Sequence, residues 1–247
     1  MLSRALLEIG KPTTYQGSVL RIVETQEYAA TTKLVESLDE QHLLEELLDE
    51  VKPPYKENTQ QLHYLISTPF RYPPLLHGSR FGGVLMPSYF YGSEKVETML
   101  TECAYYRFIF LDDMTVPYTK TVNSEHMSFS VNVNSSAMAD LTKISSPDII
   151  DSLMSPYHYQ FSQTLGKILT QEKSYDLIRY FSARDKNNGV NVALTSPDQI
   201  TSTQPEKCTN WICQTTTNQV SFNSPHIKPL SFHLDDFFVN GQLPRPA

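Results

Sequence analysis

Residues 126–134 place the strongest constraint on the fold, because apolar and polar side chains alternate there without a break. The apolar members of this segment are Met127, Phe129, Val131 and Val133. Successive side chains of a strand point to opposite faces, so these residues share one face while serines and asparagines share the other. The pattern predicts a half-buried strand, and therefore a sheet with one face on an apolar core.

The other expected elements interleave irregularly around this strand. Short β-branched or aromatic runs predict strands at residues 18–25, 88–91, 177–181, 190–194, 211–215 and 220–222. Apolar spacing and capping signals predict helices at residues 28–50, 93–106, 149–154, 157–171 and 232–238, the second with Ser93 as its N-cap. Regular alternation of strand and helix is absent, so the pattern favours an α+β fold over a doubly wound sheet.

Composition excludes several classes of protein. The chain has 247 residues, enough for one sizeable core, and a formal net charge of −7 without a Lys/Arg cluster, which disfavours direct nucleic-acid binding. The odd count of three cysteines disfavours a disulfide framework, and no Cys or His spacing predicts a metal site. No apolar run approaches membrane-spanning length and the N-terminus does not resemble a signal peptide, so a cytoplasmic location is expected.

Residues 68–87 carry four prolines and three glycines and no periodicity. We expect an irregular segment here, and loops of this kind often carry function. Arg80 lies within it, in GSRFGG, where glycines let a ligand approach the backbone and a guanidinium can bind phosphate. The same residues also suit an ordinary turn. The segment lacks the spacing of a P-loop or a dinucleotide-binding glycine motif.

Three further side chains could carry chemistry, and each has an ordinary structural alternative. Arg21 lies in the apolar strand segment VLRIVE, where it meets an acid, faces a pocket, or points to solvent from an edge strand. Glu102 falls on the border of the apolar stripe of its helix, so it is either a solvated flank or aimed into a cleft. Ser182 follows a strand, where serine binds a ligand or forms a turn, and no G-x-S-x-G motif surrounds it.

The segments around these side chains are LRIVE, KLVESLDEQHLLEELLDEVKPP, TPFRYPPLLHGSRFGG, FYGSEKVETMLTECAYYRF, IRYFSARD and GVNVAL. In combination they resemble the longer-chain branch of the RES-domain family, from about residue 20 to the C-terminus. The family is named for an arginine, a glutamate and a serine. The resemblance implies an ADP-ribosyltransferase-like split β-sheet with surrounding helices. It also implies a single domain over residues 1–247, with a helical extension at about 26–56 after the first strand and a small β extension at about 205–247.

The resemblance assigns the site residues one by one. Arg21 matches the first family arginine, in the early strand. Tyr91 matches the tyrosine that ends the short strand before the helix. Glu102 matches the essential glutamate on that helix, and Ser182 matches the serine after the late strand. Glu102, Ser182 and Arg21 are thereby expected to be catalytic, with no metal implied.

The second family arginine is matched by Arg80, whose spacing to Tyr91 is close to the family gap. One departure leaves Arg71 open as the alternative. Shorter members carry tryptophan and asparagine after this arginine, whereas Phe81 and Gly82 follow Arg80 here. Under this assignment Arg21, Arg80, Tyr91 and Ser182 would bind NAD⁺.

The resemblance implies an NAD⁺-consuming enzyme that cleaves the nicotinamide–ribose bond by hydrolysis or phosphorolysis. NAD⁺ would be a substrate, with inorganic phosphate as a candidate acceptor. Many members are toxins, so an Xre-type antitoxin is the expected protein partner, and a homodimer stays open. Two alternatives remain: an ADP-ribosyltransferase that modifies a protein, which would use the same cleft, and a catalytically inactive binding module.

Overall fold

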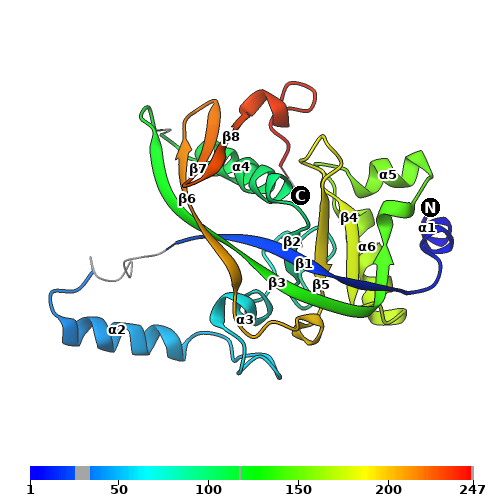
Figure 1. Cartoon of the computed structure of the whole chain (residues 1–247), viewed down its shortest axis with the longest axis horizontal. Helices are drawn as coiled ribbons and strands as arrows, with labels where there is room; N and C mark the ends of the chain where they lie inside the picture. Colours follow the sequence, from blue (N-terminus) through cyan, green and yellow to red (C-terminus); the bar gives the residue numbers. More distant parts are fainter. Residues whose placement is uncertain (26–33, 117, 246–247) are drawn as a thin grey trace.

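The computed structural model describes residues 1–25, 34–116 and 118–245, which form one eight-stranded mixed sheet with helices around it (Figure 1). The helices are α1 (Leu2–Ile9), α2 (Leu38–Glu50), α3 (Tyr64–Arg71), α4 (Val96–Asp112), α5 (Pro147–Leu153) and α6 (Gln160–Lys167). The strands are β1 (Thr13–Glu24), β2 (Phe90–Ser93), β3 (Val122–Asp140), β4 (Leu177–Phe181), β5 (Val190–Leu194), β6 (Glu206–Thr215), β7 (Gln219–Ser224) and β8 (Ile227–His233). The expected α+β class is confirmed.

The sheet divides into two arms. Strands β2, β5 and β4 form a short arm, and β1, β3, β6, β7 and β8 form a long one. The arms join where the end of β3 runs parallel to β4, from Met138 opposite Leu177. They touch again at a single described position, Leu20 of β1 opposite Ser93 of β2. Beyond that point β1 and β2 diverge, so the sheet is split there, as expected.

The long strand β3 explains why residues 126–134 alternate so regularly. Its middle pairs with β1 along almost the whole length of that strand, while its first half also pairs with β6. Phe129, Val131 and Val133 are buried, as predicted. On the polar side, Asn132 is exposed, whereas Ser128 and Ser130 are buried, and Ser128 accepts a 2.8 Å hydrogen bond from the Trp211 indole of β6.

Apolar side chains form three clusters that fix the helices to the two arms. One cluster lies between β1, β2, β3 and β5 and receives α3, which contributes Ile66 and Phe70. A second joins α1, α5 and α6 to β4 and β5. The third packs α4 under β6, β7 and β8 through Leu100, Phe108 and Trp211. Helix α4 is therefore held by the long arm and lies beside the split.

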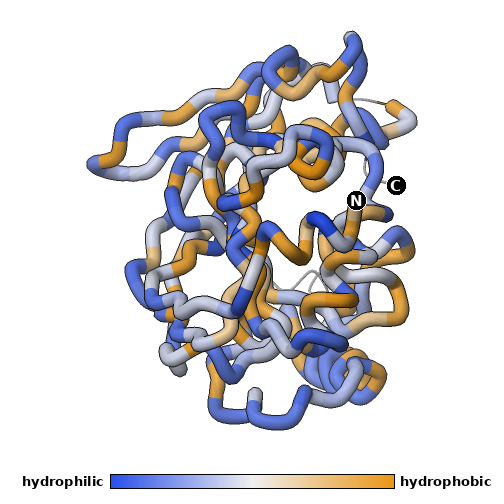
Figure 2. The backbone as a smooth tube through the Cα atoms, turned by 90° about the vertical axis from the view of Figure 1, so that its right-hand side faces the viewer, coloured by the Kyte–Doolittle hydropathy of each residue, from blue (hydrophilic) through white to orange (hydrophobic). Residues whose placement is uncertain are grey.

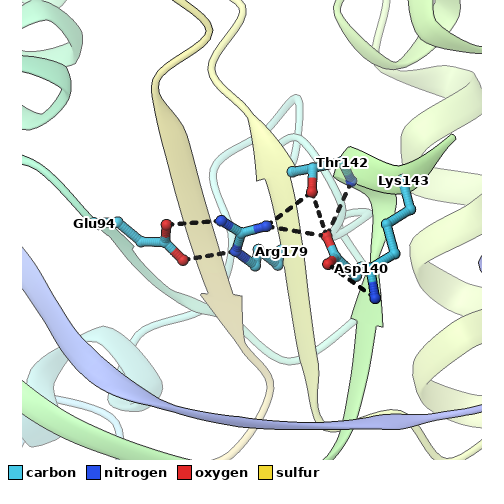
Figure 3. Close-up of polar contacts among 5 residues, drawn as sticks. All are labelled: Glu94, Asp140, Thr142, Lys143 and Arg179. Carbon is cyan, nitrogen blue, oxygen red and sulfur yellow. Dashed lines mark hydrogen bonds and ion pairs between the residues drawn. The ribbon is translucent and has the colours of Figure 1, made fainter. Parts of the chain in front are cut away.

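An ion-pair cluster ties the segment that precedes α4 to the short arm (Figure 3). Arg179 of β4 donates two hydrogen bonds to Glu94, at 2.7 and 2.9 Å. A further guanidinium nitrogen lies 3.3 Å from Asp140, at the end of β3, and 2.8 Å from the hydroxyl of Thr142. Apolar contacts thus hold α4 against the long arm, and this ion-pair cluster holds the segment before α4 against the short arm.

Two expectations about local structure are wrong. Ser93 does not cap α4; the helix begins at Val96 with Lys95 as its N-cap, because Ser93 is the last residue of β2. The segment 68–87 is not irregular throughout, since α3 extends to Arg71 with Pro69 in its last turn. The remainder, from residue 72 to 89, has no helix or strand. The expected helix at 28–50 is described only from Leu38, and residues 28–33 lie outside the described part.

Hydrophobic and hydrophilic residues alternate over short distances along most of the backbone (Figure 2). Helix α2 stands apart from the sheet (Figure 1). It has no buried residue, although it carries several leucines. Within the described residues, no helix has the length and apolar character needed to cross a membrane.

Candidate active site

A cavity of about 440 Å³ lies beside the split, between α4, the last three residues of β2 and the loop that contains Arg80. This volume is in the range of small-molecule sites, about 300–1,000 Å³. Its wall includes most of the side chains predicted from the sequence: Arg21, Arg80, Tyr91 and Glu102. The remaining lining includes Leu20, Ile22, Ser79, Ser93, Met99, Cys103, Tyr106, Tyr159, Tyr180 and Asn191.

The register of three strands brings one polar face to this cavity. Ser93 of β2 lies opposite Asn191 of β5, which lies opposite Tyr180 of β4. Residues directly opposite one another in antiparallel strands share a face. Tyr91 lies two residues before Ser93 and therefore points the same way. The short arm thus supplies a wall made of hydroxyl, amide and aromatic groups.

Glu102 enters the cavity from α4, and one of its oxygens is held by two donors. The Ser182 hydroxyl donates to Glu102 Oε1 at 2.6 Å, and the Asn191 amide donates to the same atom at 2.7 Å. The Asn191 carbonyl in turn accepts a 2.6 Å hydrogen bond from Ser93. From the described residues Oε2 receives no hydrogen bond. The carboxylate is therefore fixed through one oxygen and keeps the other for a ligand.

Ser182 has its direction set by the backbone that follows it. The side chain has no exposed surface, and its oxygen accepts hydrogen bonds from the backbone amides of Arg184 and Asp185, both at 3.1 Å. Because those amides already donate to the oxygen, the hydroxyl hydrogen is left to point at Glu102. Asp185 itself accepts a 2.8 Å hydrogen bond from Thr98 of α4, so the loop is joined to the helix.

Arg21 spans the gap where β1 and β2 diverge. Its Nη1 donates a 2.8 Å hydrogen bond to the Tyr91 carbonyl, and its guanidinium lies 5.1 Å from the centre of the Phe90 ring. Its Nε is buried without a partner among the described residues. Burial lowers the pKa of Arg21 to about 10, so the side chain is charged at neutral pH. No described carboxylate neutralises it.

Arg80 is 9% exposed and also lacks a carboxylate partner in the described part of the chain. Its Nη1 donates to the carbonyls of Leu153 and Ser155, at 2.7 and 3.3 Å, where α5 ends. The guanidinium lies 4.4 Å from the centre of the Tyr159 ring. A buried cation held only by carbonyls and a ring remains able to attract an anion.

Tyr91 holds the Arg80 loop in place. Its hydroxyl is 2.8 Å from the Ser79 hydroxyl and accepts a 3.2 Å hydrogen bond from the Phe81 amide. Burial raises the pKa of Tyr91, so the phenol stays neutral. Gln163 of α6 adds 3.0 Å hydrogen bonds to the carbonyls of His77 and Ser79. The loop is therefore ordered by contacts on both sides.

Comparison with known proteins identifies the family. A family model for the RES domain matches residues 54–214, which is more than half of the chain. This chain belongs to the RES-domain family. The predicted family is thereby confirmed over this range, which begins after Arg21.

Other comparisons of this RES-domain chain are more distant. It is similar to a chain in the crystal structure of the M. tuberculosis MbcT–MbcA toxin–antitoxin complex, with 10% identity and a TM-score of 0.47. The likeness covers 85% of this chain and 90% of that chain. A search of curated proteins gives no match.

The fold brings all the predicted side chains to one place. Four of them line the cavity, and Ser182 reaches it through Glu102. Arg71, the alternative to Arg80, does not line the cavity; it donates to the Pro53 carbonyl and lies 4.0 Å from the centre of the Tyr55 ring. Of the two arginines, Arg80 is therefore the one in position to contact a ligand there.

Two polar residues of the RES-domain site escaped the sequence analysis, Asn191 and Ser93. Asn191 is 5% exposed and lies in the middle of the strand VNVAL. An amide among apolar strand residues was a usable signal, because a buried polar group requires a partner. Ser93 gave a misleading signal, since serine before acidic residues is also typical of a helix N-cap.

Among the described residues, no cluster of three or more His, Cys, Asp or Glu side chains could hold a metal ion. The three cysteines are unpaired and differ in exposure: Cys103 is half-buried, Cys208 is exposed and Cys213 is buried. Burial raises the pKa of Cys103 to about 12, so this thiol at the cavity wall stays protonated at neutral pH.

Proposed function

We propose that this RES domain is a toxin-like enzyme that consumes NAD⁺ by cleaving the nicotinamide–ribose bond. Family membership supports an enzyme that acts on NAD⁺. The observation that carries the proposal is the setting of Glu102: Ser182 and Asn191 hold one carboxylate oxygen, in a cavity that also contains two arginines without carboxylate partners.

The chemistry required of Glu102 follows from the bond to be broken. As the bond between the nicotinamide nitrogen and ribose lengthens, positive charge develops on the sugar, as in glycoside cleavage. The bonding electron pair returns to the pyridinium ring, so nicotinamide leaves neutral and needs no acid. A fixed carboxylate beside the sugar stabilises the developing charge, and the acceptor oxygen forms the new bond. With water as acceptor, one proton is released.

The arginines would bind the pyrophosphate. NAD⁺ carries two negative charges there, and Arg21 and Arg80 supply two positive charges within a chain of net charge −7. Guanidinium groups suit phosphate oxygens because they offer several donors in one plane. Tyr91 would shape the nicotinamide pocket, and Ser182 would keep Glu102 oriented. Glu102, Ser182 and Arg21 are thus the proposed catalytic residues.

The acceptor separates three reactions that share this cavity. Water gives free ADP-ribose, inorganic phosphate gives ADP-ribose 1″-phosphate, and a protein side chain gives an ADP-ribosylated protein. The proposal favours the first two, and makes the third a rival with the same glutamate. An Xre-type antitoxin, which the family resemblance implies, and a cytoplasmic location, which the sequence pattern favours, accompany the proposal.

Incubation of the purified protein with NAD⁺, with and without phosphate, tests the proposal. Chromatography measures nicotinamide release, and mass spectrometry identifies the second product. We expect nicotinamide to be released with free ADP-ribose or its 1″-phosphate. NAD⁺ that stays intact under both conditions would refute the enzymatic function, and a modified protein as the sole product would favour the rival transferase.

A further inference from the structure

A second cavity, of about 300 Å³, lies on the opposite side of Arg21 from the first. Helix α3 and the loop after it form most of its wall, together with β1. Its lining includes Arg21, Tyr64, Thr68, Tyr72, Pro73 and Ser88. None of the residues assigned to bond cleavage, apart from Arg21, belongs to it.

The two cavities adjoin each other at Arg21 and along one loop. Arg21 is the single residue that lines both. The loop after α3 first passes the second cavity, with Tyr72 and Pro73, and then the first, with Leu75 and His77. Arg21 therefore borders both cavities, and a ligand whose anionic group binds the Arg21 guanidinium has one cavity on either side of that group.

The second cavity suits a flat, uncharged ring. Two tyrosines and two prolines offer flat apolar surfaces, and the tyrosine side chains are accessible, with Tyr64 60% and Tyr72 40% exposed. The hydroxyls of Thr68 and Ser88 supply polar contacts, and Arg21 is the only charged side chain in the lining. Nucleobases bind in such places by stacking on aromatic rings, with polar groups at their edges.

Contacts within the protein fix the backbone that surrounds this cavity. Phe70 of α3 stacks on Phe90 of β2, with 6.1 Å between ring centres. The Ser88 hydroxyl donates a 2.7 Å hydrogen bond to the Tyr72 carbonyl, which joins the loop after α3 to the segment that precedes β2. The tyrosine rings therefore stand on an anchored backbone, and their outer surfaces have room for a ligand.

We propose that this second cavity binds the adenosine half of the dinucleotide, with the adenine ring against Tyr72. The inference rests on the proposed function, because it places the other half of the same substrate. The charge of Arg21 then lies at the junction, where the pyrophosphate joins the two nucleosides. Glu102 lies in the first cavity, with the nicotinamide ribose. The dinucleotide thus binds across the split between β1 and β2.

Two substrates with the same scissile bond test this placement. NAD⁺ has the adenylyl half, and nicotinamide mononucleotide lacks it. We expect Tyr72→Ala to lower kcat/KM for NAD⁺ on the order of tenfold, as the loss of one stacked base implies, while kcat/KM for nicotinamide mononucleotide stays unchanged. Tyr72→Phe keeps the ring and should restore the value for NAD⁺. Tyr118→Ala, an exposed tyrosine that lines neither cavity, is the matched control.

The outcomes separate this inference from the proposed function. If the wild-type protein cleaves neither substrate, the proposed function fails. If it cleaves both with equal kcat/KM, or if Tyr72→Ala lowers both equally in a protein with a normal melting curve, the adenosine site is refuted. Should Tyr72→Ala fail to fold, Tyr72→Leu replaces it, because leucine keeps an apolar side chain without an aromatic ring. A preference for NAD⁺ that stays unchanged in the folded variant also refutes the site.

Discussion

Two strand arginines of this protein, Arg21 and Arg179, have opposite kinds of partners. Arg179 pairs with two carboxylates, those of Glu94 and Asp140 (Figure 3). Arg21 has a carbonyl and an aromatic ring, and burial lowers its pKa. A lowered arginine pKa means that the folded protein disfavours the charge it carries. We infer that Arg179 serves stability, and that Arg21 is retained for binding an anion.

The same substitution at both positions should therefore give opposite results. Arg21→Met should leave the melting temperature unchanged or higher, because a charge without a counter-ion is removed, and should raise KM for NAD⁺ on the order of tenfold or more. Arg179→Met should cost about 1–3 kcal/mol of unfolding free energy, because two partly buried carboxylates lose their donor. Thermal melts and steady-state kinetics measure both. Normal NAD⁺ binding by Arg21→Met would remove that residue from the site.

Asn191 should act by positioning Glu102. We expect Asn191→Leu to lower kcat about 10- to 100-fold with KM for NAD⁺ nearly unchanged, because the carboxylate keeps only Ser182 as a donor. Asn134→Leu, at an exposed position of β3, should leave both constants at wild-type values. A rise in KM without a change in kcat would instead indicate that Asn191 contacts the substrate in its ground state.

At the scale of single residues, the sequence predicted which side chains come together in the site, but not which groups form hydrogen bonds with each of them. Arg21, Arg80, Tyr91, Glu102 and Ser182 were matched through a family pattern. Residue patterns alone left a structural alternative for each of them except Tyr91, which only the family pattern singled out. Several of their partners lie far away in sequence, such as the Leu153 carbonyl that accepts from Arg80 and the Asn191 amide that donates to Glu102. Such contacts depend on how the loops pack, which side-chain periodicity does not encode.

The loop from residue 182 to 189 links α4 to the short arm of the sheet. The Ser182 amide donates a 2.7 Å hydrogen bond to the Gly189 carbonyl, and Thr98 of α4 binds Asp185. A Cβ atom on Gly189 would lie 2.1 Å from both the Asp185 carboxylate and the Thr98 hydroxyl. The loop can approach the helix this closely because residue 189 has no side chain.

Gly189→Ala should therefore move the loop off α4. We expect a loss of about 1–3 kcal/mol in unfolding free energy, in the range of overpacked sites, and at least a tenfold fall in nicotinamide release as Ser182 shifts from Glu102. Gly83→Ala is the control, because no heavy atom lies within 4 Å of its added Cβ. Urea unfolding and the NAD⁺ assay measure the two effects, and wild-type behaviour of Gly189→Ala would show that the loop tolerates displacement.

Strands were easier to predict than their surroundings. Strands β4 and β5 have the bounds predicted from their apolar runs, Leu177–Phe181 and Val190–Leu194. Strand β8 was missed because its sequence IKPLSFH contains a proline, which an edge strand tolerates. Helix α3 was missed because Pro69 suggested a loop, although a proline in the last turn removes little. In both cases, the free-energy cost of a proline depends on where it lies within the strand or helix.

At the scale of the whole molecule, an acidic chain concentrates positive charge at one split in its sheet. The net charge is −7, yet Arg21 and Arg80 line a single cavity without carboxylate partners among the described residues. The split provides the space, α4 supplies the carboxylate and the short arm supplies its donors. The division of the chain into a RES core and two extensions stays a prediction, although β6, β7 and β8 continue the same sheet.

The most direct test of the central claim is the rate of nicotinamide release from NAD⁺ by Glu102→Gln, compared with Glu97→Gln. Both residues lie on α4, but Glu97 is exposed and lines neither cavity. With folding checked by thermal melts, we predict that Glu102→Gln lowers the rate by about 10²- to 10³-fold and that Glu97→Gln keeps the wild-type rate. A folded Glu102→Gln protein that releases nicotinamide at the wild-type rate would contradict the account.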